Sequence, residues 1–353
     1  MKISIHVKKS VGKKVEVQQD QIDDFMVLCV GSINIDDVYS VPHIVNPGET
    51  ISSVSVNVFP GGKGANQSVA LALAGAKVAH LGKIGHDGDW IKKLMASYGV
   101  QTDLIHVDDQ ARTGKAIIQV ASNGENSIIL SPGSNHSISL SAISKAFSTN
   151  ASFNWLLLQN EINIDAAIHA INQSRQTSNV IVCLNPSPFP ASLKNWMPVN
   201  LVDILLLNDT ECSELSFQYN GHQQDDPETH LKNIMLNLPT VSIVVVTLGG
   251  NGVIFGIKSP NTKFPLILNV PVIRAVKVVD TTGAGDTFTG YFVSSLQSLS
   301  RDVLEMEINT NQPAIFFRVL NAVQIAIKAS GLCCEQHGAM VSIPRINDVL
   351  YSQ

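Results

Sequence analysis

The residues best suited to chemistry lie at positions 278–290, where a valine-rich strand end breaks into Gly-Ala-Gly before a helical pattern resumes. Gly283 and Gly285 let the backbone turn sharply and bring its N–H groups close to a bound anion. The helix expected from Ala284 to about Leu296 would direct its unsatisfied N–H groups and the positive end of its dipole at the same point. This pattern predicts an anion-binding site.

A carboxylate, Asp286, stands in the first turn of that helix, where its charge would repel a phosphate. Two functions are open for it. As a base, Asp286 would accept the proton of a substrate hydroxyl while the Gly-Ala-Gly amides stabilise charge on a transferred phosphoryl group. Alternatively, it only caps the helix, which is a common role for Asp.

Composition limits the class of protein. The length of 353 residues fits one large α/β domain with a small appendage, and a hydrophobic content of 44% supports a sizeable core. A net charge of −5 without a concentrated basic patch argues against nucleic acid and anionic membranes as partners. No apolar run approaches the ~20 residues that span a bilayer. The expected partners are therefore small molecules.

The five cysteines are scattered and lack the spacing of a zinc site or a disulfide framework. We expect reduced thiols, which favours a cytoplasmic protein, or one that is also nuclear. Residues 1–25 are rich in lysine and have no apolar core of the kind that a secretory signal requires. They are predicted to be a flexible extension before a single domain at 26–353.

Two kinds of strand pattern are present. Valine- and isoleucine-rich runs alternate with helical patterns, which predicts a doubly wound, mostly parallel sheet flanked by helices; the runs are 25–30, 78–81, 155–159, 180–184, 204–207 and 243–246. Polar-apolar alternation flanking an Asn123-Gly124 turn predicts a separate small β-sheet that serves as a lid, at about 34–60 and 110–130. The polar segment 218–229 is expected to be a surface loop.

Several polar residues follow these strands. Asn34 and Asp36 would share one face and could hydrogen-bond a polyol, or they are simply a polar exit from the strand. The glycine-rich turn at 61–64 is not a Walker loop because Gly64 follows the lysine, but Lys63 and Asn66 supply donors near a helix N-terminus.

Two further segments suit a nucleotide. Asn208 and Glu211, one helical turn apart, could orient a hydrated Mg²⁺ on phosphates, or they are an ordinary helix start with Asn as N-cap and Glu at N3. Residues 247–252 could face a nucleotide or form a hairpin turn into the strand that follows.

The ordered set of motifs resembles the ribokinase/PfkB family of carbohydrate kinases, over about residues 26–344. The motifs that carry the resemblance are 31–36, 61–67, 208–211, 247–249 and 280–286. The resemblance implies transfer of the γ-phosphoryl group of ATP to the 5-hydroxyl of D-ribose. It also implies a doubly wound domain whose β lid forms a homodimer.

The resemblance assigns roles by position, with Asp286 as the base and Gly283, Ala284 and Gly285 as the anion hole. The sugar would be held by Asn34, Ile35, Asp36, Gly62, Lys63, Gly64, Ala65, Asn66, Glu161 and Asp286. The nucleotide and Mg²⁺ side would comprise Asn208, Glu211, Thr247, Leu248, Gly249, Gly250, Asn251, Gly252, Gly285 and Asn321. A monovalent cation, usually K⁺ in this family, would lie near Asp280, Thr282 and Ser342.

Three features depart from the family pattern. The segment 331–338 is longer than the usual loop, Tyr291 stands where a small residue is common, and Trp90 stands where glycine is often found. None of these changes removes a reactive group. Two alternatives stay open: a related kinase for another sugar or a nucleoside, and a non-catalytic sugar or nucleotide sensor. Sugar-dependent release of ADP would separate the sensor from both kinases.

Overall fold

A computed structural model describes residues 25–149, 153–177, 179–193, 198–221, 226–262, 264–273, 277–310 and 313–352. The predicted N-terminal extension lies outside the described residues, apart from Phe25.

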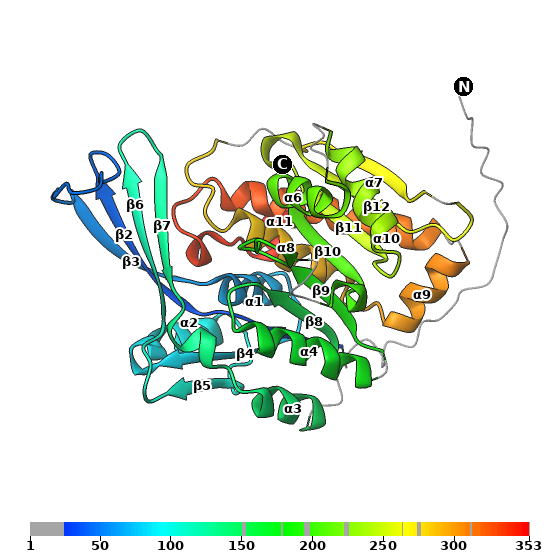
Figure 1. The fold of residues 1–353 in the computed structure, drawn as a ribbon, viewed down its shortest axis with the longest axis horizontal. Helices are drawn as coiled ribbons and strands as arrows, with labels where there is room; N and C mark the ends of the chain where they lie inside the picture. Colours follow the sequence, from blue (N-terminus) through cyan, green and yellow to red (C-terminus); the bar gives the residue numbers. More distant parts are fainter. Residues whose placement is uncertain are drawn as a thin grey trace.

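The main sheet has the strand order β13-β12-β11-β10-β9-β8-β1-β4-β5 (Figure 1). All neighbours from β11 to β5 pair in parallel, and β12 and β13 add an antiparallel edge. The predicted doubly wound sheet is confirmed, with valine, leucine and isoleucine on both buried faces. The strands are β1 (Met26–Val30), β4 (Val78–Gly85), β5 (Ile105–Asp108), β8 (Phe153–Gln159), β9 (Ile181–Asn185), β10 (Ile204–Asn208), β11 (Ile243–Thr247), β12 (Val253–Ile257) and β13 (Leu266–Val270).

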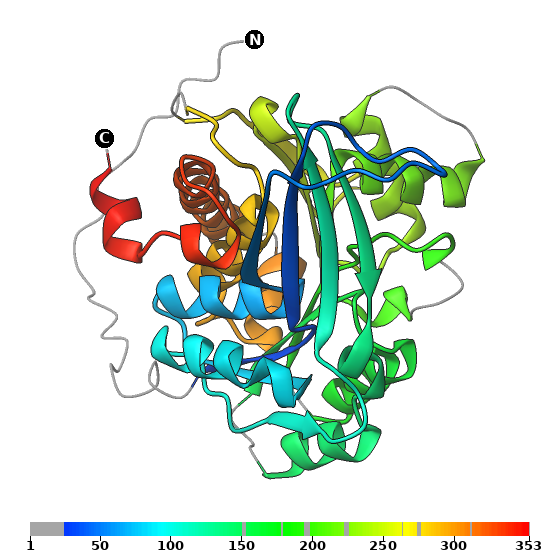
Figure 2. The same cartoon turned by 90° about the vertical axis from the view of Figure 1, so that its left-hand side faces the viewer.

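Helices cover both faces of this sheet (Figure 2). One face packs against α1 (Lys63–Leu73), α2 (Asp89–Ser97), α8 (Ala284–Leu296), α9 (Arg301–Asn309), α10 (Pro313–Cys333) and α11 (Ile346–Tyr351). The other packs against α3 (Leu140–Thr149), α4 (Ile164–Gln176), α6 (Asp209–Asn220) and α7 (Pro227–Asn237). Short 3₁₀ turns are η2 (His86–Gly88), η3 (Gly133–Ser137), η4 (Val199–Leu201), η5 (Gly249–Asn251) and η6 (Met340–Ser342).

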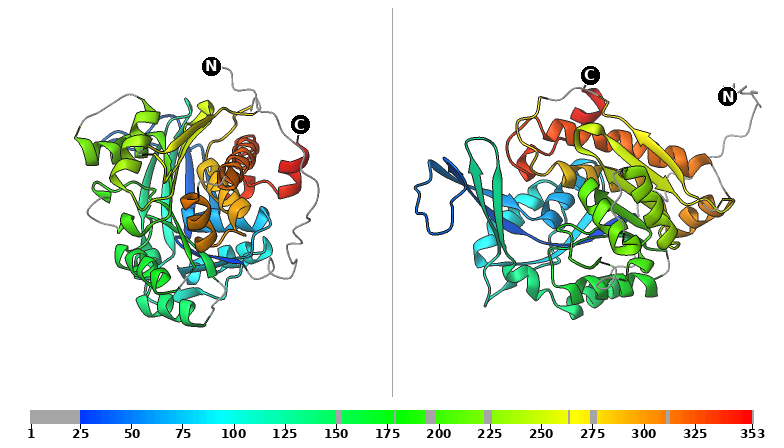
Figure 3. Two further views of the ribbon diagram at one scale, coloured as in Figure 1. Left: turned by 90° about the vertical axis from the view of Figure 1, so that its right-hand side faces the viewer. Right: turned by 45° about the horizontal axis from the view of Figure 1, so that its top comes forward.

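A second sheet stands out to one side of the main body, on the left in Figure 1, and is seen from two further directions in Figure 3. Its order is β3-β2-β6-β7, and only the central pair, β2 and β6, is parallel. The strands are β2 (Asn34–Val41), β3 (Ser55–Gly61), β6 (Gly114–Ala121) and β7 (Asn126–Ser131). The predicted small sheet is therefore present, and we call it the lid sheet. Because β2 begins four residues after β1 ends, the chain passes directly from the main sheet into the lid sheet.

The prediction of a surface loop at 218–229 was wrong at both ends, because helices extend into it from either side. Helix α6 runs to Asn220 and stops at Gly221, whose backbone is left-handed with φ of 69°. Helix α7 begins at Pro227, and the Asp226 carboxylate accepts hydrogen bonds from the first-turn N–H groups. Local capping chemistry, a glycine C-cap and an Asp-Pro start, sets these boundaries more strongly than the polarity of the segment.

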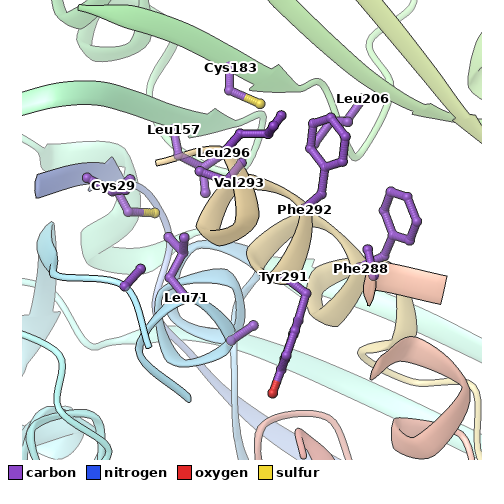
Figure 4. Packing of buried hydrophobic residues seen from close by; sticks show 14 of the residues in the cluster. Cys29, Leu71, Leu157, Cys183, Leu206, Phe288, Tyr291, Phe292, Val293 and Leu296 are labelled. Atoms are coloured by element: carbon purple, nitrogen blue, oxygen red, sulfur yellow. The ribbon is translucent and has the colours of Figure 1, made fainter. Parts of the chain in front are cut away.

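The α8 helix, which begins at the expected site of chemistry, is largely buried. Figure 4 shows its side chains Phe288, Tyr291, Phe292, Val293 and Leu296 pointing into the core. Phe288 and Phe292 stack with ring centroids 6.2 Å apart. The Tyr291 hydroxyl donates to Pro344 O at 2.6 Å, so this departure from the family pattern ties α8 to the C-terminal segment.

Close packing of α1 against α8 brings two distant motifs together. A Cβ added at Gly290 would lie 2.4 Å from Ala70 Cβ, so the two helices approach as closely as glycine and alanine allow. This contact aligns the first turns of α1 and α8.

By length and composition, α10 could cross a membrane, and it is the one described helix that meets this test. It buries Val319, Ala322 and Ala326 in the same core as α8, and it carries Arg318 and Lys328. These contacts are those of a core helix.

The cysteines agree with the expectation of reduced thiols. All five are free, and Cys29, Cys183, Cys212 and Cys333 are buried. Burial raises the pKa of the Cys29 thiol to about 11, which keeps it protonated at neutral pH. A cytoplasmic location stays a prediction.

Candidate active site

Two adjoining cavities open at the carboxyl ends of the parallel strands, where ligands bind in open α/β sheets. The first, of about 230 Å³, is polar and includes Lys63, Asn208, Glu211, Gly283 and Asp286 in its lining. The second, of about 630 Å³, is bounded by Thr247, Gly249, Gly250 and Gly252 and by apolar side chains such as Val253, Val278 and Ile327. Thr281, Gly285 and Phe288 border both, so the first turn of α8 lies between the two cavities.

The first turn of α8 has the backbone expected of an anion site. Gly283 is the N-cap with φ of 80°, and a Cβ there would lie 2.8 Å from Ala339 Cα. A Cβ at Gly285 would meet nothing within 4 Å, so this residue faces open space. The Ala284 N–H donates to Thr281 O at 3.2 Å, which leaves the later amides, beginning with Gly285, as the better anion donors.

The Asp286 carboxylate is held from α1. Its Oδ2 accepts from Asn66 Nδ2 at 3.0 Å, and its Oδ1 accepts from Gln67 Nε2 at 2.9 Å. Its side chain is buried, with 8% exposed. These partners come from another helix, and the N-cap of α8 is Gly283, so the capping alternative for Asp286 is not supported. A buried, oriented carboxylate beside an anion site is the arrangement that a general base requires.

The predicted sugar residues gather beside this carboxylate. The Asn34 side chain accepts from Asn135 Nδ2 at 2.7 Å at the start of β2. The Asp36 carboxylate lies over the backbone of Gly61, where any Cβ would come within 2.5 Å of both carboxylate oxygens. Glu161, beyond the end of β8, accepts through Oε2 from the Ser32 hydroxyl at 2.6 Å and from Lys63 N at 3.1 Å. Segments 31–36, 61–66 and 161 therefore meet at one point.

Glycine is required where the start of α1 approaches the turn after β1. A Cβ at Gly64 would lie within 2.6 Å of the backbone of Gly31 and Ser32, and one at Gly62 would lie 2.7 Å from Asn34 N. Gly62 also has φ of 91°. Ile35 and Ala65 are buried in the core, so they support this turn.

Burial and neighbouring acidic groups shift the pKa values of Asp36 and Lys63 at the site. Burial, together with the charges of Glu161, Asp286 and Asp37, raises the pKa of Asp36 to about 7. Its Oδ1 is buried and has no partner among the described residues. For Lys63, burial opposes the charged form, but the charges of Asp286, Glu161 and Glu211 outweigh it and raise the pKa. The site holds a lysine among acids and an unsatisfied acceptor, as expected where hydroxyl groups bind.

Asn208 and Glu211 form the capping box that was one of the two alternatives. Glu211 N donates to Asn208 Oδ1 at 2.8 Å, and Asn208 N donates to Glu211 Oε2 at 2.9 Å. Both residues also line the polar cavity with Lys63 and Asp286. The local contact is therefore a helix start, and its position leaves the role toward Mg²⁺ and phosphate open.

Residues 247–252 are both a hairpin turn and part of the apolar cavity. Leu248 N donates to Gly252 O at 2.8 Å, and β11 and β12 pair antiparallel on either side. Leu248 and Asn251 do not border the cavity.

The predicted nucleotide contact of Asn321 is not supported. Its side chain is exposed on α10 and lines neither cavity. The cavity meets this helix at Ile327, about 9 Å further along its axis. The helix also continues to Cys333 rather than ending near 329, so Ser330, Gly331 and Cys334 supply the wall there.

Asp280, Thr282 and Ser342 converge behind the first turn of α8. Asp280 accepts through Oδ1 from Thr282 N at 2.9 Å and through Oδ2 from Gly338 N at 2.9 Å. The Ser342 hydroxyl contacts Gly338 O and Ala339 O, and Cys333 Sγ bridges Ser342 and Thr282 O. These contacts join the C-terminal segment to the anion turn, by which we mean residues 280–286 at the start of α8. Most of the contacting atoms are oxygens, the ligand type that a hard cation prefers.

Three buried amides and one half-buried amide at the site were not assigned from the sequence: Gln67, Asn135 and Gln159, and Asn185. Gln159 and Asn185 end strands, a position that signals the crevice but not a partner. Gln67 follows Asn66 in the glycine-rich segment. Asn135 gave no signal, because its contact with Asn34 spans 101 positions.

The fold and site define a small-molecule kinase in which a buried carboxylate lines a polar cavity, and the first turn of α8 separates this cavity from an apolar one. Residues 24–346 match the pfkB family carbohydrate kinases. The chain is 36% identical to a ribokinase of Haemophilus influenzae over 272 residues, covering 76% of this chain and 84% of that protein. It is 32% identical to a ribokinase of Staphylococcus aureus, covering 92% and 98%.

A solved structure gives the same result. The ribokinase of Arabidopsis thaliana complexed with ribose and ATP superposes with a TM-score of 0.73 at 27% identity, covering 92% of this chain and 97% of that one. The chain belongs to the pfkB family of carbohydrate kinases. It is an ATP-dependent sugar kinase.

Proposed function

We propose that the chain is a ribokinase, which transfers the γ-phosphoryl group of ATP to the 5-hydroxyl of D-ribose. The observation that carries this proposal is the position of Asp286. Its carboxylate is held by Asn66 and Gln67 at the start of α8, beside the acceptors Asp36 and Glu161. The relatives and the superposed structure named above are ribokinases, and the latter was solved with ribose and ATP.

On the sugar side, acceptors and donors alternate as a polyol requires. Asp36 has a buried oxygen with no partner in the described part of the chain and would accept from sugar hydroxyls. Asn34 gives its side-chain oxygen to Asn135, so its NH₂ group is left to donate to a sugar oxygen. Asp286 would then accept the proton of the hydroxyl that attacks the γ-phosphorus.

On the phosphate side, the α8 amides from Gly285 and the Lys63 ammonium would offset charge on the transferred group. Glu211, whose buried carboxylate lines the polar cavity beside Asn208, would hold the hydrated Mg²⁺. When bound, Mg²⁺ supplies positive charge against the phosphate oxygens. The apolar cavity bounded by Val253, Val278 and Ile327 suits the adenine base.

We expect activation by K⁺ at constant ionic strength. The reason is that oxygen atoms of Asp280, Thr282 and Ser342 gather behind the first turn of α8. A cation bound there would hold this turn in place. Turnover measured in K⁺, Na⁺ and a bulky organic cation checks this, and Ser342→Ala should reduce the K⁺ effect. Equal rates in all three salts would rule out the cation role.

The lid sheet is the proposed dimer contact. Strand register places Val56, Val58, Ile117 and Ile129 on the face opposite Asp36, and all four are exposed. Such a patch on an open sheet favours pairing with a second copy. We expect a dimer by sedimentation velocity and a monomer for Ile129→Asp with unchanged fold. A monomeric parent protein would contradict this contact.

An ADP-release assay with Mg-ATP and K⁺ tests the function, with D-ribose, fructose, adenosine or no acceptor supplied. Selective turnover with ribose supports the proposal. Turnover with fructose or adenosine instead would keep the reaction and replace the acceptor. Silence of folded protein with every acceptor would favour a sugar or nucleotide sensor.

A further inference from the structure

Gln67 is a fully buried amide that reaches the proposed base from α1. Its Nε2 donates to Asp286 Oδ1 at 2.9 Å and also to Asn185 Oδ1 at 3.0 Å. Its Oε1 accepts from Gln159 Nε2 at 2.6 Å. Both N–H bonds and the carbonyl of this side chain are therefore engaged, by groups from β8, β9 and α8.

The contacts allow only one orientation of the Gln67 amide. Asn185 Nδ2 donates to the backbone carbonyl Leu206 O at 3.0 Å, and a carbonyl can only accept. The Asn185 oxygen must then face Gln67. With Gln67 turned over, its carbonyl would face this oxygen and the Asp286 carboxylate, and its NH₂ group would face the NH₂ group of Gln159.

Asn66, the other partner of Asp286, is not fixed in this way. Its Oδ1 is buried and has no partner among the described residues. The family resemblance places Asn66 on the sugar side of the site and assigns no role to Gln67. Two side chains donate to Asp286 among the described residues. Gln67 is the one whose N–H bonds and carbonyl oxygen all have partners.

We propose that Gln67 is the positioning residue of the base, and that Gln159 and Asn185 fix its orientation. Gln67 keeps the Asp286 carboxylate in one plane, because a charge-assisted hydrogen bond from a fixed donor is strong and directional. Gln67 has no exposed surface and borders neither cavity, so it acts on substrate through the side chains it holds, Asp286 and Asn185. The inference rests on the proposed function as a sugar kinase.

Replacing Gln67 by Met, which is similar in length and lacks donors, tests this role. We expect kcat to fall by about tenfold to 10²-fold, because small displacements of a reacting group cost this much. KM for the sugar should change little. The acidic limb of the kcat profile should move to higher pH, because the ionised base has lost a donor, so the defect shrinks as pH rises.

Gln159→Met gives a second test that leaves the donor itself in place. It should shift the pH profile in the same direction with a smaller loss of kcat, and the double variant should lose little more than Gln67→Met alone, because the residues form one network. This variant carries the test if Gln67→Met does not fold.

Ser68→Ala is the matched control. Ser68 is the next residue of α1, equally buried, and its hydroxyl pairs with His80 Nδ1 at 2.8 Å, away from Asp286. It should lower the midpoint of thermal unfolding and leave the pH profile unchanged. An unshifted profile in Gln67→Met, or an equal shift in Ser68→Ala, would overturn the proposal.

A crystal structure of the Gln67→Met variant tests the positioning role without an activity measurement. We expect the Asp286 carboxylate to be rotated or in several conformations, and an unmoved, ordered carboxylate would contradict a positioning role. If the parent protein phosphorylates another sugar, the kinetic test is made with that sugar. If it phosphorylates none, the proposed kinase function fails, while the crystal structure still decides whether Gln67 holds Asp286.

Discussion

Asp286→Asn should lower turnover by about 10²-fold or more, because it removes a positioned acid/base group. The fold should persist. The new amide at position 286 brings an NH₂ group against the NH₂ group of one of its neighbours. Asn66 can turn over so that its oxygen, which has no partner among the described residues, accepts from the new amide. The loss of stability is then about one hydrogen bond, on the order of 1 kcal/mol. Initial rates with saturating ATP and sugar, together with sugar binding by calorimetry, check this.

Asp302→Asn is the control for this substitution. Asp302 also lies in the first turn of a helix, α9, but it is exposed and lies outside both cavities. It should leave turnover unchanged. If Asp286→Asn retained near-normal turnover, the base would have to be another group, and the role of Gln67 inferred above would fail with it.

Asp36→Asn should weaken sugar binding by about tenfold to 10³-fold, as expected when an ionised acceptor of one or two hydroxyls is lost. The effect belongs mainly in KM and in the dissociation constant of the sugar, since Asp36 holds substrate rather than takes its proton. Asp37→Asn is the matched control, because Asp37 lies on the opposite face of β2 and pairs with Lys115 at 2.7 Å.

The pKa of Asp36 adds a pH signature to the same experiment. Because the pKa of Asp36 is raised to about 7, the free protein below pH 7 carries a protonated Asp36 that must ionise before it can accept two hydroxyls. Sugar affinity should therefore fall as pH drops below about 7, toward tenfold per pH unit at the limit. Asp36→Asn should lack this limb. A pH-independent affinity in the parent protein would contradict the assignment.

The stability of this variant should move the other way. A carboxyl group whose pKa is raised on folding, from 3.8 to about 7, disfavours the folded state once it ionises. The parent protein therefore loses stability as pH rises from about 4 to 7, and the loss persists above pH 7. Asp36→Asn removes this cost, so its unfolding midpoint should be higher at pH 8 and should differ less at pH 4. The Asp36→Asn substitution would then weaken sugar binding and at the same time raise the stability of the fold.

Much of the fold followed from local pattern. Helix α8 begins and ends where glycine chemistry and apolar periodicity placed it, at Ala284 and Leu296. The buried strands β1, β8, β10 and β11 match the predicted runs within two residues, and Gly124 makes the expected turn with φ of 87°. Polar composition misled at 218–229, because helix ends depend on single capping residues. The edge strand β13 was not predicted at all.

The sequence by itself determined which residues have the chemistry for phosphoryl transfer, since glycines at a helix start, an adjacent carboxylate and the ordered motifs are all local features. Only the tertiary structure decided what holds them. Asp286 meets Asn66 and Gln67 across 220 and 219 positions, respectively, because Gly290 and Ala70 let α1 and α8 pack closely. Local periodicity carries no information about such pairings, because they depend on which two helices pack against each other in the folded chain.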